Sequence, residues 1–287
     1  MILFEERAAT VLYNVLSTIG FTKKFLLPLN VCPIVPDTFI RANVKFEFID
    51  ISLDTLCMDE ELILEKIKND KEIGGILFVY TFGIKRDMQP FYKKIKEINS
   101  AIFIIDDMCP SIQKFDYDIN NSYADMALFS SGYSKYVDIG FGGYGFLKNS
   151  VYSATFKDKS QTKEFLEYKE KILEQIPLMK AHKEKLNNIY RIHIPQKYHL
   201  GEKFNNWRFS IMVDNKEEIL KKIFEVEGLF ASSHYPQVDY NYVEHPIQNS
   251  NAAKVHVKIL NLFNDFRFDQ AKALAVAQIV KQNLPKE

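Results

Sequence analysis

Short apolar runs separated by helical stretches dominate the first half of this 287-residue chain. Each run has the length of a buried strand and is bounded by turn-forming residues, whereas the stretches between them place apolar residues three and four apart. Parallel strands need such crossover helices, so the alternation predicts an α/β fold with a mostly parallel central sheet and helices on both faces. The predicted strands are 24–28, 44–50, 75–80, 101–106 and 124–129, and the predicted helices are 5–19, 58–69 and 88–99, with another opening at Asn30 to Pro33.

The second half of the chain has a different sequence pattern. Residues 161–188 form one long helical pattern of interleaved charged and apolar residues, which we interpret as a linker or surface helix that could also carry a dimer contact. These features divide the chain into a large α/β domain, residues 1–195, and a small C-terminal α+β domain, residues 196–287. Within the small domain we expect strands at 207–213 and 255–260 and helices at 216–224 and 269–282.

Composition and charge argue against several classes of function. The chain has 37 Lys plus Arg and 37 Asp plus Glu, so a net charge of zero speaks against nucleic acid or an anionic membrane as a partner. The amino terminus does not resemble a signal peptide, and no apolar run approaches the ~20 residues that cross a bilayer. Cys32, Cys57 and Cys109 lack metal-ligand spacing. We therefore expect a cytoplasmic protein with reduced thiols, no metal and no membrane insertion.

Four of the eleven glycines lie within six positions, at Gly140, Gly142, Gly143 and Gly145. Residues 140–145 spell G-x-G-x-x-G, but a dinucleotide site needs that motif directly between a strand and a helix. Here the motif follows a polar loop and leads into a short strand pattern, so we reject a nicotinamide or flavin site. The glycines are better explained by a strand that passes close to another backbone or to a ligand.

Three polar residues come just after predicted strands: Asp107, Ser130 and Lys135. Ligands of parallel sheets bind at the carboxyl ends of the strands, so we expect these side chains to converge on one site. Burial would lower the pKa of Lys135 from its usual value of about 10.4, and the neutral amine could then form a Schiff base. Taken alone, Lys135 is more simply explained as a surface lysine in a turn, and Asp106 and Asp107 as part of a capped loop after a strand.

A lysine and a carboxylate together point to pyridoxal phosphate (PLP) chemistry. In PLP enzymes a lysine holds the aldehyde, and an aspartate keeps the ring nitrogen protonated so that the ring can accept electrons. Helix-start amides and hydroxyl groups hold the phosphate. Lys135, Asp107 and Ser130 fit these three roles, with the first turn of helix 5–19 assisting Ser130.

Several segments resemble the DegT/StrS family of PLP-dependent sugar aminotransferases, which have the fold type I architecture. IIDDMC resembles the strand that ends in the cofactor aspartate, ADMALFSSGYSKY resembles the Phe-Ser-x-x-x-x-Lys signature, and the glycines after it match the Gly-x-Gly-Gly run. The resemblance implies PLP as the cofactor, Lys135 as its Schiff-base lysine, Asp107 as its ring partner and Ser130 as a phosphate ligand. Supporting likenesses are LLPLNVCPIVPDTFIRANVKFEFIDI, FVYTFGIKRDM, WRFSIMVDN and SSHYP.

The chain resembles a shortened and divergent member of that family. Where relatives carry phosphate-binding residues at the start of the first helix, this chain has Arg7 and Ala8, and Arg7 is the candidate phosphate partner. Glu6 beside it would repel a phosphate if it pointed inward. Cys32 replaces the aromatic residue that stacks on the ring in relatives, and Pro110 takes the place of their glutamine near the phenolic oxygen. Most of the loop after the glycine run is missing, which removes surface that relatives use to hold a nucleotide.

The resemblance implies an aminotransferase that moves an amino group from an amino acid, glutamate in most relatives, to a keto-sugar or a small keto compound. Cell-surface polysaccharide synthesis is the expected setting, and a homodimer with sites at the subunit interface is the expected assembly. His234, Tyr235 and Tyr80 are candidates for the substrate side. Two alternatives stay open. One is a non-catalytic relative that binds PLP weakly or not at all and serves as a partner or regulator, and the other is lyase or decarboxylase chemistry on the same cofactor.

Overall fold

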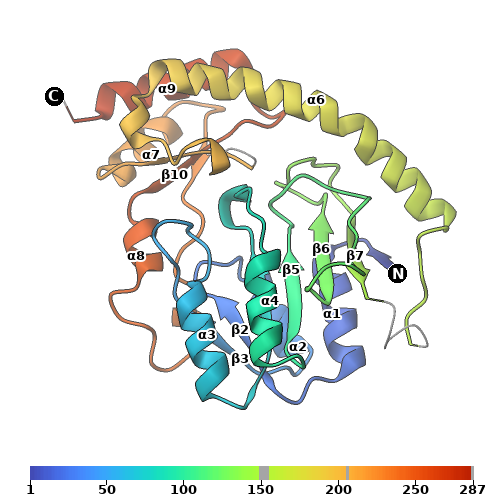
Figure 1. Ribbon diagram of the computed structural model, residues 1–287. Helices are drawn as coiled ribbons and strands as arrows, with labels where there is room; N and C mark the ends of the chain where they lie inside the picture. The colour runs from blue at the N-terminus through green and yellow to red at the C-terminus, as the bar shows by residue number, and fades with distance from the viewer. Residues whose placement is uncertain (149–154, 205–206, 286–287) are drawn as a thin grey trace.

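The computed structural model describes residues 1–148, 155–204 and 207–285, and it places a smaller unit above a seven-stranded sheet that has helices on both faces (Figure 1). The strands in the order β6-β5-β4-β2-β3 are parallel neighbours, and β7 and β1 extend the β6 edge in antiparallel pairing. The predicted α/β class with a mostly parallel sheet is therefore confirmed. The strands are β1 (Ile2–Glu5), β2 (Lys24–Pro28), β3 (Phe46–Ile49), β4 (Ile73–Val79), β5 (Phe103–Asp107), β6 (Met126–Ser130) and β7 (Gly143–Leu147).

The structure differs from the sequence prediction at the N-terminus, where a helix over 5–19 is expected. Ile2–Glu5 form β1, which pairs with β7, and the helix starts only at Ala8. Such a short strand carries little periodicity, and it forms because β7 offers a sheet edge. Gly143 of β7 lies against the start of the helix, where a Cβ atom would come within 2.0 Å of the Ala8 nitrogen. The expectation that the glycines let a strand approach another backbone is confirmed.

Crossover helices cover both faces of the sheet. α1 and α2 pack together on one face, while α3 and α4 pack together on the other, which is the front of the sheet in Figure 1. Right-handed crossovers explain this division, because the chain crosses the sheet from β2 to β3 in one direction and from β3 through β4 to β5 in the other. The helices are α1 (Ala8–Ile19), α2 (Ile34–Arg41), α3 (Glu60–Asn69) and α4 (Gln89–Ile98).

A long helix, α6 (Lys163–His193), arches over the sheet and leads into the small unit (Figure 1). That unit contains an antiparallel sheet in the order β8-β10-β9. The strand predicted at 255–260 is wrong in part, because Ser250 caps a short helix there by accepting the N–H of Ala253 at 2.9 Å. The elements are β8 (Phe209–Met212), α7 (Lys216–Phe224), β9 (Ala231–Ser232), α8 (Asn251–His256), β10 (Ile259–Leu262) and α9 (Gln270–Asn283).

Two hydrophobic cores stabilise this arrangement. The larger core fills both sides of the seven-stranded sheet and also includes Trp207 and Val238 from the C-terminal part of the chain. The smaller core joins Leu186 and Tyr190 of α6 to β8, β10 and α9. Because both cores take residues from α6, the helix ties the two units together, and the domain boundary between residues 195 and 196 stays a prediction.

Candidate active site

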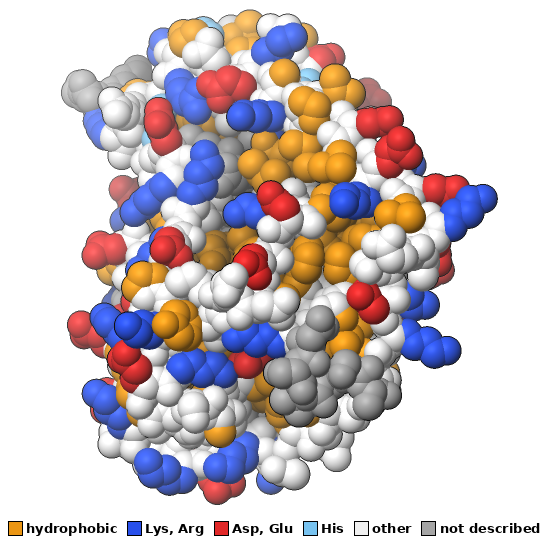
Figure 2. All heavy atoms as spheres, turned by 45° about the vertical axis from the view of Figure 1, so that its right-hand side comes forward, with side chains coloured by type: hydrophobic (Ala, Val, Ile, Leu, Met, Phe, Trp, Pro, Cys, Tyr) orange, Lys and Arg blue, Asp and Glu red, His pale blue; other side chains and the backbone are white. Residues whose placement is uncertain are grey.

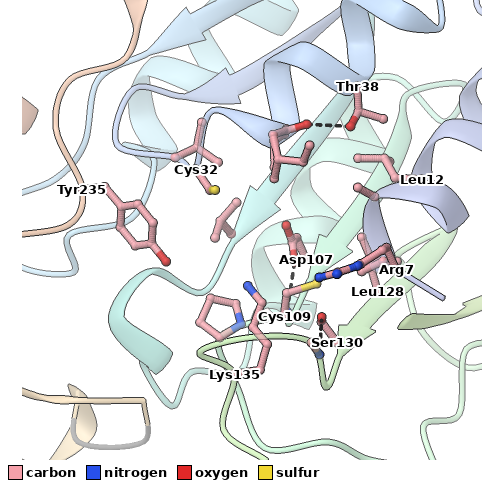
Figure 3. Close-up of a pocket in the computed structure, with 18 of the residues that line it drawn as sticks. Arg7, Leu12, Cys32, Thr38, Asp107, Cys109, Leu128, Ser130, Lys135 and Tyr235 are labelled. Atoms are coloured by element: carbon pink, nitrogen blue, oxygen red, sulfur yellow. Dashed lines mark hydrogen bonds between the residues drawn. The ribbon is translucent and has the colours of Figure 1, made fainter. Parts of the chain in front are cut away.

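A cavity of about 240 Å³ opens at the carboxyl ends of the parallel strands, between the start of α1, α2 and the loop after β6 (Figure 3). The sequence prediction names nine site residues, and the structure brings most of them to this cavity. His234 and Tyr80 are the two that do not line it. The predicted residues that line the cavity are Arg7, Ala8, Cys32, Asp107, Ser130, Lys135 and Tyr235.

Asp107 ends β5 and faces the cavity, which it shares with Lys135 (Figure 3). Its Oδ1 atom accepts the backbone N–H of Cys109 at 2.9 Å, which orients the carboxylate. Burial raises the pKa of Asp107 above its usual value, while Cys109 and the positive charge of Lys135 oppose that rise. Asp107 is therefore a buried acceptor whose negative charge is favoured by a cation beside it.

Asp106, the preceding residue, lines a different hollow, because successive side chains of a strand point to opposite faces. Its carboxylate accepts hydrogen bonds from the hydroxyl groups of Tyr92 and Tyr117, the second at 3.0 Å. Burial raises the pKa of Asp106 to about 6. Tyr80 lies in this cluster beside Asp106, so the structure does not bring Tyr80 to the substrate side of the cavity.

The loop from Gly132 to Asp138 presents Lys135 to the cavity. Gln113 donates from Nε2 to the carbonyl oxygens of Ser130, at 2.6 Å, and Val137, at 3.2 Å. These two hydrogen bonds tie the ends of the loop together. A lysine side chain is long and flexible, so the position of the loop backbone decides where its Nζ atom can reach.

The charge state of Lys135 differs from the sequence expectation. Burial alone lowers its pKa, but Cys109, Tyr235 and Asp107 raise it by more, so the pKa of Lys135 lies above its ordinary value. The expectation of a lowered pKa is therefore wrong, because it considers burial without the acidic groups that the fold places around the amine. The protonated form of Lys135 is therefore favoured in this cavity, and Nζ must lose a proton before it can attack a carbonyl carbon.

The start of α1 forms an end of the cavity that suits an anion. Arg7 holds the N-cap position without a side-chain cap, and the first turn of the 12-residue helix contains no acidic residue. Ser130 lines the same cavity, and its Oγ atom accepts the N–H of Gly132 at 3.3 Å. Glu6 is exposed and is not among the lining residues, so it does not oppose an anion here.

Tyr235 and His234 are adjacent in the chain but differ in position. Tyr235 lines the cavity, and Figure 3 shows its hydroxyl group on the side of Lys135. His234 is exposed, and its carbonyl oxygen accepts the Nδ2–H of Asn261 at 2.8 Å. Of the three residues expected on the substrate side, His234, Tyr235 and Tyr80, only Tyr235 lines this cavity.

The structure adds residues that the sequence prediction misses. Gln113 and Trp207 both hold the loop that carries Lys135. Asn30 lines the cavity and donates from Nδ2 to the Leu56 carbonyl at 2.9 Å, while its buried Oδ1 atom has no partner among the described residues. An unpaired buried oxygen at a cavity marks a place for a donor group on a ligand. No local motif surrounds these residues, so only the fold reveals them.

Within the described ranges, no group of three or more His, Cys, Asp or Glu side chains could hold a metal ion. None of the helices in that part of the chain has the length and apolar character to cross a membrane. Cys32, Cys57 and Cys109 are free thiols.

Comparison with known proteins finds similarity through structure rather than sequence. No protein-family model matches the chain, and no curated protein matches it. The structure is similar to the sugar aminotransferase CalS13 from Micromonospora echinospora, with a TM-score of 0.77, 12% identity, and coverage of 98% of this chain and 87% of that chain. PseC from Helicobacter pylori, an aminotransferase involved in the biosynthesis of pseudoaminic acid, gives a TM-score of 0.76 at 15% identity over 99% of this chain and 86% of PseC. The chain has the fold of these aminotransferases.

A third similar structure contains the cofactor but belongs to an enzyme that is named for a different reaction. The GDP-4-keto-6-deoxy-D-mannose-3-dehydratase from Escherichia coli, with bound hydrated PLP, gives a TM-score of 0.71 at 15% identity over 98% of this chain and 87% of that chain. The predicted fold type I architecture is thus confirmed. At such identities the likeness establishes the fold alone, and the reaction has to be argued from the site.

Proposed function

We propose that this protein is a PLP-dependent aminotransferase. The observation that carries the proposal is the meeting of Asp107 and Lys135 in one cavity, although they follow different strands. A buried carboxylate and a half-buried primary amine, together at the carboxyl edge of a parallel sheet, are the two groups that a Schiff-base cofactor with a basic ring nitrogen requires. The similarity in fold to PLP-binding and amino-transferring proteins supports the same conclusion.

The groups that line the cavity fit PLP at both ends. Arg7, the Ser130 hydroxyl and the uncapped N-terminus of α1 suit a phosphate dianion, because guanidinium and helix-start N–H groups favour negative charge. In the same cavity, Asp107 can accept a hydrogen bond from the ring nitrogen and hold its proton there. Cys32 takes the place of a stacking aromatic residue, so ring contact there is weaker than in the relatives that the sequence resembles.

When bound, PLP supplies an aldehyde that condenses with amines and a ring that accepts electrons. The residues of the chain then have separate tasks. Asp107 keeps a proton on the ring nitrogen, and Arg7 and Ser130 orient the cofactor through its phosphate. The Nζ atom of Lys135, once it has lost its own proton, would be the base that takes a proton from the Cα atom of an amino donor and returns it to another carbon. Tyr235 lines the same cavity, with its hydroxyl group on the side of Lys135.

For the substrates, we propose an amino acid, glutamate first, as donor and a keto-sugar or small keto compound as acceptor. The similarity to CalS13, a sugar aminotransferase, and to PseC favours a sugar acceptor. The setting in surface polysaccharide synthesis is proposed from the family resemblance of the sequence. Asn30 favours an acceptor with a hydroxyl group, because its Oδ1 atom lacks a hydrogen-bond donor among the described residues. Because a dehydratase has a similar fold, a lyase reaction is the alternative that has to be distinguished from amino transfer.

We also propose a homodimer in a reducing compartment. Figure 2 shows hydrophobic side chains gathered across the face that includes the right-hand side of Figure 1. Exposed apolar side chains of α6 and of the loop before β7, including Leu166, Leu173 and Phe141, are of the kind that subunit interfaces cover. Three free thiols agree with a reducing compartment. Sedimentation of the purified protein tests the dimer, and a monomer at micromolar concentration would contradict it.

The absorption spectrum of the protein with added PLP tests the proposed function. We expect a visible band in the wild type and in Lys114→Ala, a control at an exposed lysine outside the cavity, and no such band in Lys135→Ala. Adding glutamate should then remove the band as the amino group moves to the cofactor. A wild type that develops no band at any PLP concentration would contradict the proposal and leave the non-catalytic alternative as the better account.

A further inference from the structure

Trp207 reaches from the start of the small unit to the loop that carries Lys135. It is the only tryptophan of the chain and is 5% exposed. Its Nε1–H donates to the carbonyl oxygen of Ser134 at 2.6 Å, across 73 positions of sequence. Ser134 immediately precedes Lys135, so this hydrogen bond acts on the peptide that directs the lysine.

The backbone of Ser134 needs support of this kind. Its φ is +63°, in the left-handed region, which is unfavourable for a residue other than glycine. The N–H of Ser134 donates to Oδ2 of Asp138 at 2.7 Å, and the carbonyl receives Trp207. Both backbone polar groups of the residue before Lys135 are therefore fixed, and the small unit supplies one of the two hydrogen bonds.

The ring of Trp207 also packs against Tyr235, which lines the cavity. It stacks on Tyr235 with ring centroids 5.8 Å apart and an angle of 17° between the planes. The guanidinium carbon of Arg208 lies 5.3 Å from the indole centroid, and Lys183 Nζ donates to the Trp207 carbonyl at 2.8 Å. A single rigid side chain, itself held by its neighbours, thus contacts both the lysine loop and the aromatic residue beside the amine.

We propose that Trp207 is a positioning residue that sets Lys135 and Tyr235 relative to each other and so couples the small unit to the reactive amine. The loop geometry stands without any ligand, and only the consequence for amino transfer rests on the proposed function. Its role differs from packing alone, because the hydrogen bond and the stack use separate parts of the indole. Trp207→Phe keeps a ring for the stack and removes the donor, whereas Trp207→Leu removes both.

The test measures how fast trinitrobenzenesulfonate labels Lys135, quantified by mass spectrometry of its peptide, in protein without PLP. We expect Trp207→Phe to raise the rate about fivefold, as the loss of one hydrogen bond would, and Trp207→Leu to raise it further, while other lysines keep their rates. Phe230→Leu is the matched control, because Phe230 packs on Phe263 and Phe268 of the small unit. Unchanged labelling in both Trp207 variants, or an equal rise in Phe230→Leu, would overturn the proposal.

A rescue experiment separates positioning from general loosening. Glycine adopts the left-handed conformation without cost, so Ser134→Gly in the Trp207→Phe background should return the labelling rate part of the way to that of the wild type. No return would mean that Trp207 does not act through Ser134 and would overturn the proposal. Because the labelling reaction contains no cofactor, its outcome is independent of whether the protein binds PLP, and a failure of either proposal can be told from a failure of the other.

Discussion

Asp106 and Asp107 are neighbours at the end of one strand, yet their surroundings have little in common. Asp106 lies in a cluster of tyrosines, and the hydroxyl groups of Tyr92 and Tyr117 donate to its two carboxylate oxygens. Asp107 accepts a backbone N–H from Cys109 and faces a cavity that also holds Lys135. The first carboxylate is satisfied by the protein, whereas the second is left with capacity for a ligand.

The comparison teaches that burial by itself does not mark a functional acid. Burial raises the pKa of both carboxyl groups, so a perturbed pKa alone would select either one. What separates them is the partner: tyrosine hydroxyl groups complete a structural network around Asp106, and an amine able to do covalent chemistry stands beside Asp107. Substituting each residue in turn tests whether Asp107 is functional and Asp106 structural.

Asp107→Asn should have the largest effect. The amide cannot hold a proton on a ring nitrogen through a negative charge, so we expect transamination to slow by on the order of 100-fold or more, as for other preorganised electrostatic groups. Asp106→Asn is the matched control, being one position away, and should keep most of the rate. Steady-state kinetics with glutamate and a keto acceptor measures both, and equal losses in the two variants would remove the distinction.

Arg7→Ala tests the end of the same cavity that suits an anion. Losing a charge-assisted hydrogen bond of about 1.5–3 kcal/mol should weaken PLP binding by roughly 10- to 100-fold, while pyridoxal without phosphate should bind wild type and variant alike. Titration of the absorption band gives both affinities, and Arg7→Lys should fall between them because it keeps the charge. If the variant lost affinity for pyridoxal to the same degree, Arg7 would not be a phosphate partner.

Asp106→Asn should have the smallest effect, visible in the pH dependence of stability. The pKa of Asp106 is about 6 in the folded protein and about 4 in the unfolded chain, so between these values the folded state holds a proton that the unfolded chain has lost. The stability that Asp106 contributes is therefore present in full below pH 4, falls as pH rises to 6 and stays level above it. Relative to the wild type, the variant should gain roughly 2 kcal/mol between pH 4 and pH 7.

Urea unfolding of wild type and Asp106→Asn at several pH values measures this difference directly. Other titrating groups cancel in the comparison, because both proteins contain them. A flat difference would mean that the pKa of Asp106 is the same in the folded and the unfolded state, and it would contradict the rise that burial produces.

Much of the fold could be read from local pattern. The strands of the parallel sheet and their crossover helices follow from apolar runs and helical spacing, each of which lies within one short segment. Asp107, Ser130 and Lys135 could be placed together because the carboxyl ends of parallel strands share one edge. The choice of Asp107 over Asp106 came from the family resemblance, and the alternation of side chains along β5 agrees with it.

Other features were decided only by contacts between distant segments. Strand β1 forms because β7 offers it an edge. The pKa of Lys135 lies above its ordinary value because the fold brings Cys109, Tyr235 and Asp107 around it. The hydrogen bond from Trp207 to Ser134 joins two units of the molecule. Most helices and strands, and the reactive residues at their ends, follow from the local sequence, since both depend on near neighbours. The pKa values and orientations of those residues follow from tertiary contacts, because burial and hydrogen-bond partners come from the whole chain.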